Sequence, residues 1–120
     1  MVDRPKRLTA RFYRTATGKE PVRDWLLDIE TMDRRIVGAD IAAVEFGWPI
    51  GMPTCRPVGG HGLREVRSTI RAGKVEARVY FGIDGDTMVL LHGAEKKPAR
   101  QHDDIDIAET RWSDYKRRKG

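Results

Sequence analysis

Apolar side chains in the first half of the chain recur with the period of a helix. Pro21 suits a first helical turn, and four apolar residues follow at positions i, i+3, i+4 and i+7: Val22, Trp25, Leu26 and Ile29. A second helix is predicted to begin near Thr31, a residue type that caps helices, and to be ended by Gly47 and Pro49. Its buried stripe is predicted to comprise Val37, Ile41, Val44 and Trp48.

Alternating apolar and polar positions dominate the second half. Residues 75–83 have the clearest period of two in the chain, with apolar and polar side chains facing opposite ways. Residues 63–71 before them are also a predicted strand, and residues 87–93 after them are nearly all apolar, as expected for a central strand covered on both faces. Turns at Ala72-Gly73 and Asp84-Gly85-Asp86 are predicted to connect the three strands as an antiparallel meander.

The remaining segments complete an α+β pattern. Residues 7–14 predict a short N-terminal strand, residues 49–62, with three prolines and four glycines, predict an irregular segment, and a last helix is predicted from about Asp103. We therefore predict one α+β domain over residues 1–120. Its small, antiparallel-rich sheet would combine the N-terminal strand with the meander, and two N-terminal helices and a C-terminal helix would pack against one face.

The net charge indicates a class of partner. The 120 residues include 23 Lys and Arg against 18 Asp and Glu, a formal net charge of +5. A basic balance favours a polyanionic partner, because Lys and Arg release counterions from phosphate backbones. No apolar run reaches the roughly 18 residues of a membrane helix, and the basic N-terminus lacks the apolar stretch of a signal peptide. We expect a cytoplasmic protein without a membrane partner.

Cysteine and histidine usage argues against a metal centre. Cys55 is the single cysteine, which excludes an intramolecular disulfide and a cysteine-based zinc site. His61, His92 and His102 do not have the spacing of typical metal ligands. The sequence also lacks a P-loop, an HExxH motif, a GxSxG motif and a dinucleotide-binding glycine pattern. We expect neither a metal nor a cofactor.

Basic side chains gather in two places. If the predicted strands pair antiparallel, Arg67 and Arg78 face the same surface. Residues 93–104 follow the last strand and carry four more candidates: Lys96, Lys97, Arg100 and His102. Arginine offers a planar fork for phosphate, lysine a point charge, and histidine a proton donor or acceptor near neutral pH. Such groups together could bind RNA phosphate and assist attack on it.

Each feature also has a purely structural interpretation. A lysine pair after a strand is often a solvated loop, and alternate arginines often only solvate a sheet face. His92 lies within an apolar strand, which favours a buried, hydrogen-bonded histidine over a catalytic one. Trp25, Trp48 and Trp112 lie on apolar faces and are expected in the core. Composition and spacing therefore leave an RNA enzyme and a binding module both open.

Three segments in this order resemble the HigB-like, phage-derived branch of the RelE toxin superfamily: LREVR, ARVYFGIDGDTMVLLHGAEKKP and DDIDIAETRWSDYKRR. The leading FYRTATGKEPVRDWLLDI is similar to the usual opening of that branch, and the resemblance covers about residues 10–118. It implies a RelE-like fold and a toxin of a type II toxin–antitoxin system. It further implies metal-independent cleavage of mRNA, generally in the ribosomal A site.

The resemblance also implies roles for individual residues. Arg67 in LREVR and Arg78 in ARVYF correspond to phosphate-binding positions at the catalytic site. Lys96 and Lys97 correspond to the basic loop after the last strand, Lys96 as an RNA contact and Lys97 as a catalytic group. In this chemistry the RNA 2′-hydroxyl attacks the adjacent phosphate, so cations that offset the developing charge are expected to matter most.

The chain departs from the family pattern after the lysine pair. The family stretch usually reads like TQKTP, whereas this chain has PARQHDD. Arg100 falls where a further basic residue is usual and is expected to contact RNA, as is Arg64. His102 is assigned as a substitute acid or base from its chemistry, not from a family match. This departure affects the catalytic groups that the family pattern places in the loop after the lysine pair.

The implied partners are a helix-turn-helix antitoxin from a neighbouring gene, the ribosome and mRNA, with operator DNA bound only through the toxin–antitoxin complex. Two alternatives stay open. One is a non-enzymatic toxin of the same fold that blocks DNA gyrase, as in the ParE branch. The other is a catalytically degenerate RNA- or protein-binding module. The basic loop and the histidines favour the nuclease, because a gyrase blocker needs no acid–base group.

Overall fold

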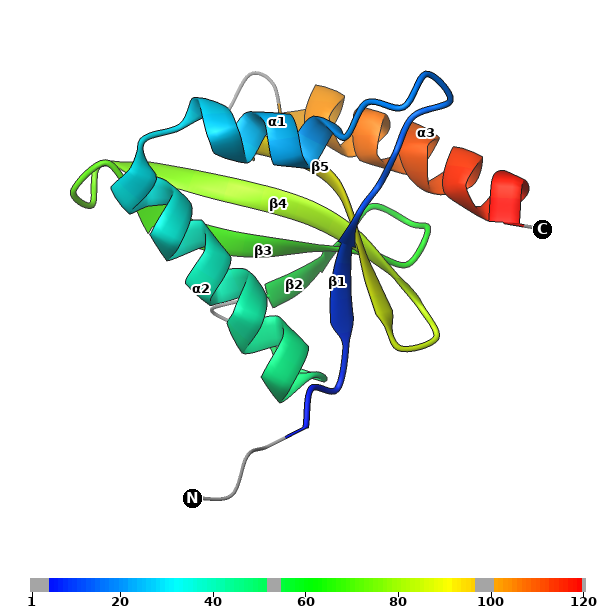
Figure 1. Ribbon diagram of the computed structural model, residues 1–120, viewed down its shortest axis with the longest axis horizontal. Coiled ribbons are helices and arrows are strands. Elements are labelled where there is room, and N and C mark those ends of the chain that lie inside the picture. The colour runs from blue at the N-terminus through cyan, green and yellow to red at the C-terminus, as the bar shows by residue number, and fades with distance from the viewer. Residues whose placement is uncertain (1–4, 52–54, 97–100, 120) are drawn as a thin grey trace.

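A five-stranded sheet with helices on both sides forms the computed structural model, which describes residues 5–51, 55–96 and 101–119 (Figure 1). The elements follow in the order β1 (Thr9–Phe12), α1 (Pro21–Asp28), α2 (Thr31–Gly47), β2 (Cys55–Val58), β3 (Leu63–Ile70), β4 (Val75–Asp84), β5 (Thr87–Glu95) and α3 (Gln101–Lys119). The predicted α+β fold is thus confirmed. Within the described residues, no helix is long and apolar enough to cross a membrane.

The sheet has the strand order β1-β5-β4-β3-β2. Strands β2 to β5 pair antiparallel, whereas β1 joins β5 in parallel, with Thr9 opposite Thr87. The meander predicted over residues 63–93 is confirmed, and Gly85 adopts the positive φ of 61° that the predicted β4–β5 turn favours. Strand β1 is shorter than the predicted residues 7–14, because only Thr9–Phe12 runs along β5.

The prediction of an irregular segment over residues 49–62 is wrong for Cys55–Val58, which form strand β2. Strand β2 pairs with β3 at the edge of the sheet, where Val58 lies opposite Leu63. Pro57 fits there because an edge strand need not donate every N–H to a neighbour. Gly59 and Gly62 have positive φ in the connection to β3. Glycine and proline in this segment therefore serve an edge strand and its turn.

The prediction that all helices pack on one face is also wrong. Helices α1 and α2 cover one face and α3 covers the other, as Figure 1 shows. Strands β4 and β5 carry apolar side chains on both sides, so each face needs a cover. Eight hydrophobic residues are buried in the cluster on the α3 face: Tyr13, Val58, Leu63, Tyr80, Val89, Leu91, Ala108 and Trp112.

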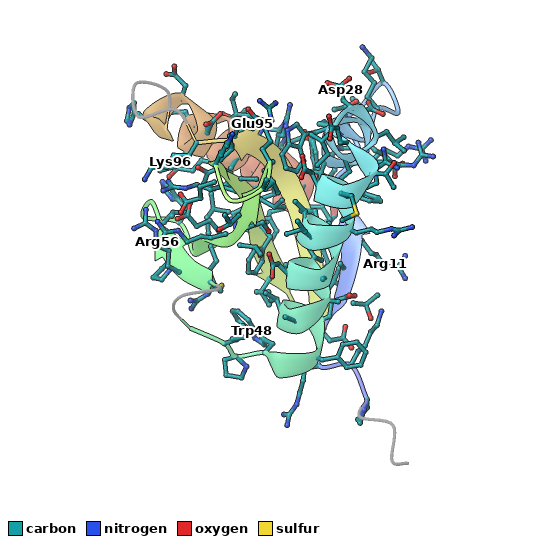
Figure 2. All side chains as sticks on the ribbon, turned by 90° about the vertical axis from the view of Figure 1, so that its left-hand side faces the viewer. Arg11, Asp28, Trp48, Arg56, Glu95 and Lys96 are labelled. Carbon is teal, nitrogen blue, oxygen red and sulfur yellow. The ribbon has the colours of Figure 1, made fainter. Side chains whose placement is uncertain are left out.

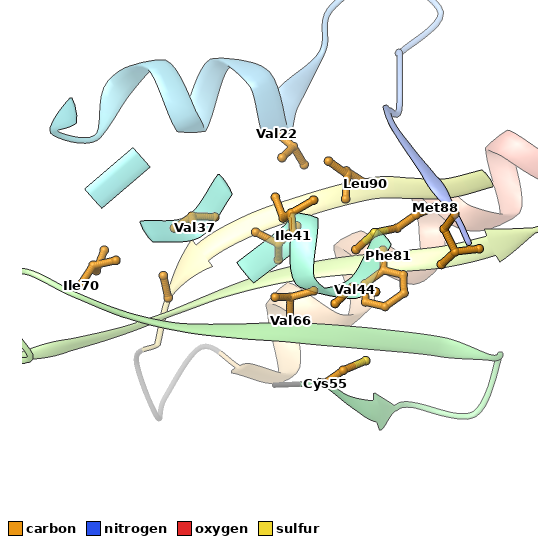
Figure 3. Close-up of a cluster of buried hydrophobic side chains, with 13 residues drawn as sticks. Val22, Val37, Ile41, Val44, Cys55, Val66, Ile70, Phe81, Met88 and Leu90 are labelled. Atoms are coloured by element: carbon orange, nitrogen blue, oxygen red, sulfur yellow. The ribbon is translucent and has the colours of Figure 1, made fainter. Parts of the chain in front are cut away.

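The α1/α2 face holds the larger apolar core (Figure 3). It contains the predicted helix stripe together with side chains from every strand, including Val66, Phe81 and Met88. Trp48 packs its edge against Phe81, with ring centroids 6.1 Å apart. The predicted core roles of the tryptophans are confirmed, since Trp25 and Trp48 pack against this core and Trp112 is buried on the opposite face.

Candidate functional site

Six charged side chains gather on the α3 face of β2, β3 and β4 and just beyond β5. We call this set the Arg–Glu cluster: Arg56, Glu65, Arg67, Glu76, Arg78 and Lys96. Strand alternation directs the members on β3 and β4 to the same side as Leu63 and Tyr80, whose side chains contact α3. Figure 2 shows Arg56 and Lys96 on one side of the molecule. Four cations thus surround two carboxylates.

The register of β3 and β4 explains the arrangement. Arg67 lies directly opposite Arg78, a like-charge pair that destabilises a sheet unless anions offset it. Two carboxylates on diagonal positions provide that offset. Glu65 lies 3.8 Å from Arg67 Nε and 3.5 Å from Arg78 Nη1, and Glu76 lies 3.3 Å from Arg67 Nη2 and 2.9 Å from Arg78 Nη2.

Two members of the cluster are buried. The side chains of Arg78 and Glu65 are 3% and 0% exposed, and Arg56 donates a hydrogen bond to Glu65. Burial opposes the charged form of Arg78, but the hydrogen bond to Glu76 and the charge of Glu65 outweigh it and raise the pKa of Arg78. The solvated sheet face considered for the arginines is therefore wrong for Arg78.

Glu76 is the more exposed of the two carboxylates. Arg78 donates to it from Nε at 3.0 Å, and the Lys96 Nζ lies 3.8 Å from Oε2. Partial burial works against ionisation, yet the Arg78 hydrogen bond and the charges of Arg67 and Lys96 lower the pKa of Glu76 below its ordinary value. The backbone N–H of Lys96 also donates to the Glu76 carbonyl at 2.7 Å, which holds this lysine beside the cluster.

Unpaired polar atoms concentrate in and beside the cluster. Among the described residues, the buried side-chain polar atoms without a hydrogen-bond partner are Glu65 Oε2, Arg67 Nε, Arg78 Nη1 and Tyr80 OH. Buried polar atoms in proteins are nearly always hydrogen-bonded, so this concentration is unusual, although Glu65 Oε2 and Arg78 Nη1 form a long ion pair of 3.5 Å with each other. These four atoms come from two facing strands, since Glu65 pairs with Tyr80 and Arg67 with Arg78.

A β-bulge places a histidine next to this group. Tyr80 lies opposite His92 and Phe81 opposite Leu90, which leaves Leu91 as an extra residue of β5. The bulge turns His92 to the α3 face, where its ring stacks on Tyr80 at a centroid distance of 6.0 Å. A regular strand would have turned His92 to the α1/α2 face together with Leu90, so simple alternation could not predict this placement.

The partners of His92 define its protonation state. Arg111 Nη1 lies 3.2 Å from His92 Nδ1, and Asp104 Oδ1 lies 2.8 Å from Nε2. Arginine can only donate, so Nδ1 accepts and the proton resides on Nε2, which donates to Asp104. Burial lowers the pKa of His92 and Arg111 adds to the shift, while Asp104 opposes it. His92 is therefore a neutral, doubly hydrogen-bonded side chain, as its apolar strand favoured.

The predicted site residues separate into three groups. Arg67, Arg78 and Lys96 meet in the Arg–Glu cluster. Arg64 lies on the opposite face, with its guanidinium 5.0 Å from the centroid of the Trp48 ring. His102 is 88% exposed and lies 3.5 Å from Asp106 within α3. The other two predicted residues, Lys97 and Arg100, lie outside the described residues.

Sequence reasoning missed the anionic half of the site. Glu65 and Glu76 alternate with the arginines on the same strand faces, so their location was readable, but their burial against the arginines was not. The hydrogen-bonding roles of Asp104 and Arg111 were hidden too, because α3 was predicted on the face already covered by α1 and α2. Within the described residues, no group of three His, Cys, Asp or Glu side chains could hold a metal ion.

A pocket of about 410 Å³ lies between α1 and the end of β5. Trp25, Arg71, Glu95 and Asp104 are among its lining residues. Arg71 and Glu95 form an ion pair of 2.6 Å across it. Asp104 lines this pocket and also binds His92, so the pocket borders the histidine network.

Comparison with known proteins assigns a family to this architecture. Residues 24–113 match the model of the family described as Phage derived protein Gp49-like (DUF891). The match spans α1 to α3 and includes the whole Arg–Glu cluster. No curated protein matches the chain.

Proposed function

The chain belongs to the phage-derived Gp49-like family, a type II toxin family related to the RelE and HigB-like toxins, and on that premise we propose that it is a toxin that cleaves mRNA. The proposed reaction takes place on the ribosome, in the cytoplasm, and stops translation. It needs no metal ion.

The observation that carries the proposal is the cation excess of the Arg–Glu cluster. Arg67 and Lys96 are 23% and 40% exposed, so both can meet a ligand from solvent. Arg78 Nη1 has no hydrogen-bond partner, and its ion-pair contact with Glu65 is a long one of 3.5 Å. A guanidinium group can donate two parallel hydrogen bonds to phosphate oxygens, and burial of the site strengthens each of these bonds. RNA, with one negative charge on each phosphodiester, is the polyanion that a translation toxin must hold.

The proposed chemistry is transfer within the RNA. The 2′-oxygen forms a bond to the neighbouring phosphorus and loses its proton, while the bond from phosphorus to the 5′-oxygen breaks and that oxygen takes up a proton. The products are a 2′,3′-cyclic phosphate and a 5′-hydroxyl. Arg67 and Arg78 offset the charge that develops on the phosphate oxygens, and Lys96 extends the positive surface along the RNA backbone.

Proton transfer is assigned to groups that can reach the RNA from solvent. His102 on the first turn of α3 is exposed, and Lys97 precedes that helix; we retain both as catalytic candidates, with Arg100 as an RNA contact. His92 is excluded from this role while both its ring nitrogens are engaged by Asp104 and Arg111. It acts as a positioning residue that stacks on Tyr80.

The proposed partner is an antitoxin encoded next to the toxin gene, with a helix-turn-helix fold and an acidic surface that covers the basic cluster. Operator DNA would then be bound through the complex and not by the toxin alone. Co-expression with the adjacent gene product should yield a stable complex that restores growth. Failure of the two chains to associate would contradict this assignment.

Induced expression in a bacterial host tests the proposed function. Wild-type protein should arrest growth, and primer extension on a reporter mRNA should show cuts within translated codons. Arg67→Ala should abolish the cuts, whereas Arg35→Ala, which removes an exposed arginine from α2 on the other side of the sheet, should retain them. Growth arrest with intact mRNA and DNA damage would instead indicate a gyrase-blocking toxin, and normal growth would indicate a binding module.

A further inference from the structure

We propose that Glu76 occupies, in the free protein, the place where an RNA phosphate binds, so that the phosphate enters by displacing this carboxylate; the inference rests on the proposed function. The two oxygens of Glu76 divide between the cations. Oε1 lies 3.3 Å from Arg67 Nη2, and Oε2 lies 2.9 Å from Arg78 Nη2. A phosphodiester has two non-bridging oxygens that can bridge the same guanidinium groups in the same way.

The two carboxylates of the cluster differ in how they are held. Glu65 is fully buried, and it pairs with Arg56 on the edge strand, with Arg67 on its own strand and with Arg78 on the facing strand. Glu76 is 29% exposed, and its charged contacts are Arg67, Arg78 and Lys96, the same groups that would face RNA. Glu65 therefore acts as a fixed counter-charge, whereas Glu76 can turn away into solvent.

Displacement also conserves charge at the site. Arg67 and Arg78 lie directly opposite each other, so a second anion beside the fixed Glu65 reduces a repulsion that weakens strand pairing. Glu76 carries one negative charge, as does each phosphodiester. Exchange of one for the other leaves the charge balance of the cluster unchanged, and return of Glu76 helps the cleaved strand to leave.

A binding measurement with an uncleavable probe separates this inference from the nuclease proposal. The probe is a fluorescent 2′-O-methyl RNA hexanucleotide, whose affinity is measured by anisotropy. Glu76→Gln should bind it about tenfold more tightly than wild type, the scale of one charge-assisted hydrogen bond. The matched control is Glu95→Gln, which removes the carboxylate of the 2.6 Å ion pair with Arg71 and one negative charge, and should stay near the wild-type affinity.

Equal gains in both variants would overturn the inference, because the effect would then be one of net charge. Weaker binding by Glu76→Gln would overturn it as well, because Glu76 would then serve to hold the arginines in place for the RNA. Tighter binding by Glu76→Gln in a protein that cuts no mRNA would sustain the inference and contradict the nuclease. If the wild type cuts mRNA but Glu76→Gln binds the probe no more tightly, the nuclease proposal would stand and the displacement inference would be contradicted.

A second measurement uses the unaltered protein, so it does not depend on the variant folding. Carbon-detected NMR can follow the pKa of the Glu76 carboxyl with and without the 2′-O-methyl hexanucleotide. Displacement removes the cations that hold this pKa low, so it should rise towards the ordinary glutamate value when the probe binds. A Glu76 pKa that is unchanged or lower in the presence of bound probe would contradict displacement.

Discussion

The face of the sheet beneath α1 and α2 and the face beneath α3 are formed by the same strands but bury different chemistry. The α1/α2 face is closed by aliphatic side chains from two helices and by Phe81. The α3 face begins as an aromatic core around Tyr80 and Trp112 and continues into the Arg–Glu cluster. Two helices cover the first face, whereas the single helix α3 covers the second (Figure 1). The charged Arg–Glu cluster lies on this second face.

The difference shows how one small sheet can separate stability from chemistry. Apolar burial on the α1/α2 face is non-directional, so it supplies stability without orienting a charged ligand. Ion pairs on the α3 face are directional, contribute little net stability when buried, and leave polar atoms unpaired. We therefore expect substitutions on the first face to change the free energy of unfolding alone. Substitutions on the second face should change both this energy and anion binding.

The largest effect is expected in the apolar core. Phe81→Ala should lower the free energy of unfolding by about 4 kcal/mol, because it removes a fully buried ring and leaves a cavity. Urea denaturation measures this loss. Addition of phosphate should not restore the lost stability beyond its effect on wild type. Restoration by phosphate would contradict the separation of the two faces.

A somewhat smaller loss is expected from the buried charge on the other face. Glu65→Ala should cost about 3 kcal/mol, because Arg78 would remain buried with one carboxylate fewer. In this variant, unlike Phe81→Ala, inorganic phosphate should recover part of the stability in urea denaturation. Equal urea curves with phosphate and with chloride at matched ionic strength would show that the cluster does not accept anions.

On both faces of the sheet, a tryptophan ring from a helix packs against a glycine in a strand. The Trp25 ring of α1 lies against Gly93 and the Trp112 ring of α3 against Gly82, so an added Cβ would fall 2.5 Å and 2.7 Å from the respective rings. Gly93→Ala and Gly82→Ala should each lower the free energy of unfolding by about 2 kcal/mol through overpacking.

The control for these two variants is Gly38→Ala. Gly38 lies inside α2 with no neighbouring atom near the position of a Cβ, so alanine should raise stability by up to about 1 kcal/mol. Thermal unfolding of the three variants checks the set. A destabilised Gly38→Ala, or tolerance of alanine at either strand position, would show that the tryptophans do not determine the cost.

Much of the first face could be predicted from the sequence, because its signals are local. Helical spacing of apolar residues located α1 and α2, alternation located β3 and β4, and a nearly continuous apolar run located β5. Strand β2 was missed because proline and glycine obscured a short edge strand whose existence depends on its pairing with β3. Placement of α3 on the second face depends on burial of both sides of β4 and β5. The apolar run of residues 87–93 predicted this for β5, but the alternation of residues 75–83 concealed it for β4.

The site was predicted only in its cationic half. Alternation brought Arg67 and Arg78 to one surface, as their register confirms. Burial of Glu65 arises from long-range contacts with β2, and the orientation of His92 depends on the bulge at Leu91. Neither has a local signature in the chain. Whether the predicted site residues act on RNA stays a prediction.

The smallest effect is a pH dependence on the α3 face. The folded protein holds His92 neutral with a pKa below 6.5, whereas the unfolded chain takes up a proton at its ordinary value. The unfolded state then binds more protons, so stability is full above that value and declines as pH falls towards the lower folded pKa. Wild type should lose stability between about pH 7.5 and pH 5.5, and His92→Gln should lose less.

The control for this slope is His61→Gln, which removes an exposed histidine from the β2–β3 connection. Urea denaturation at the two pH values compares the three proteins. His61→Gln should keep the wild-type decline. The same slope in His92→Gln would show that the interactions with Asp104, Arg111 and Tyr80 do not hold this histidine neutral.

The most direct test of the central claim compares purified proteins in a translating bacterial extract, with primer extension on a defined mRNA. Wild type and Arg35→Ala should cut the message at the ribosome, and Arg67→Ala, folded to the same extent by circular dichroism, should lose nearly all cleavage. Equal cleavage by Arg67→Ala, or an intact message with wild type, would contradict the assignment of the Arg–Glu cluster as an RNA-cleaving site.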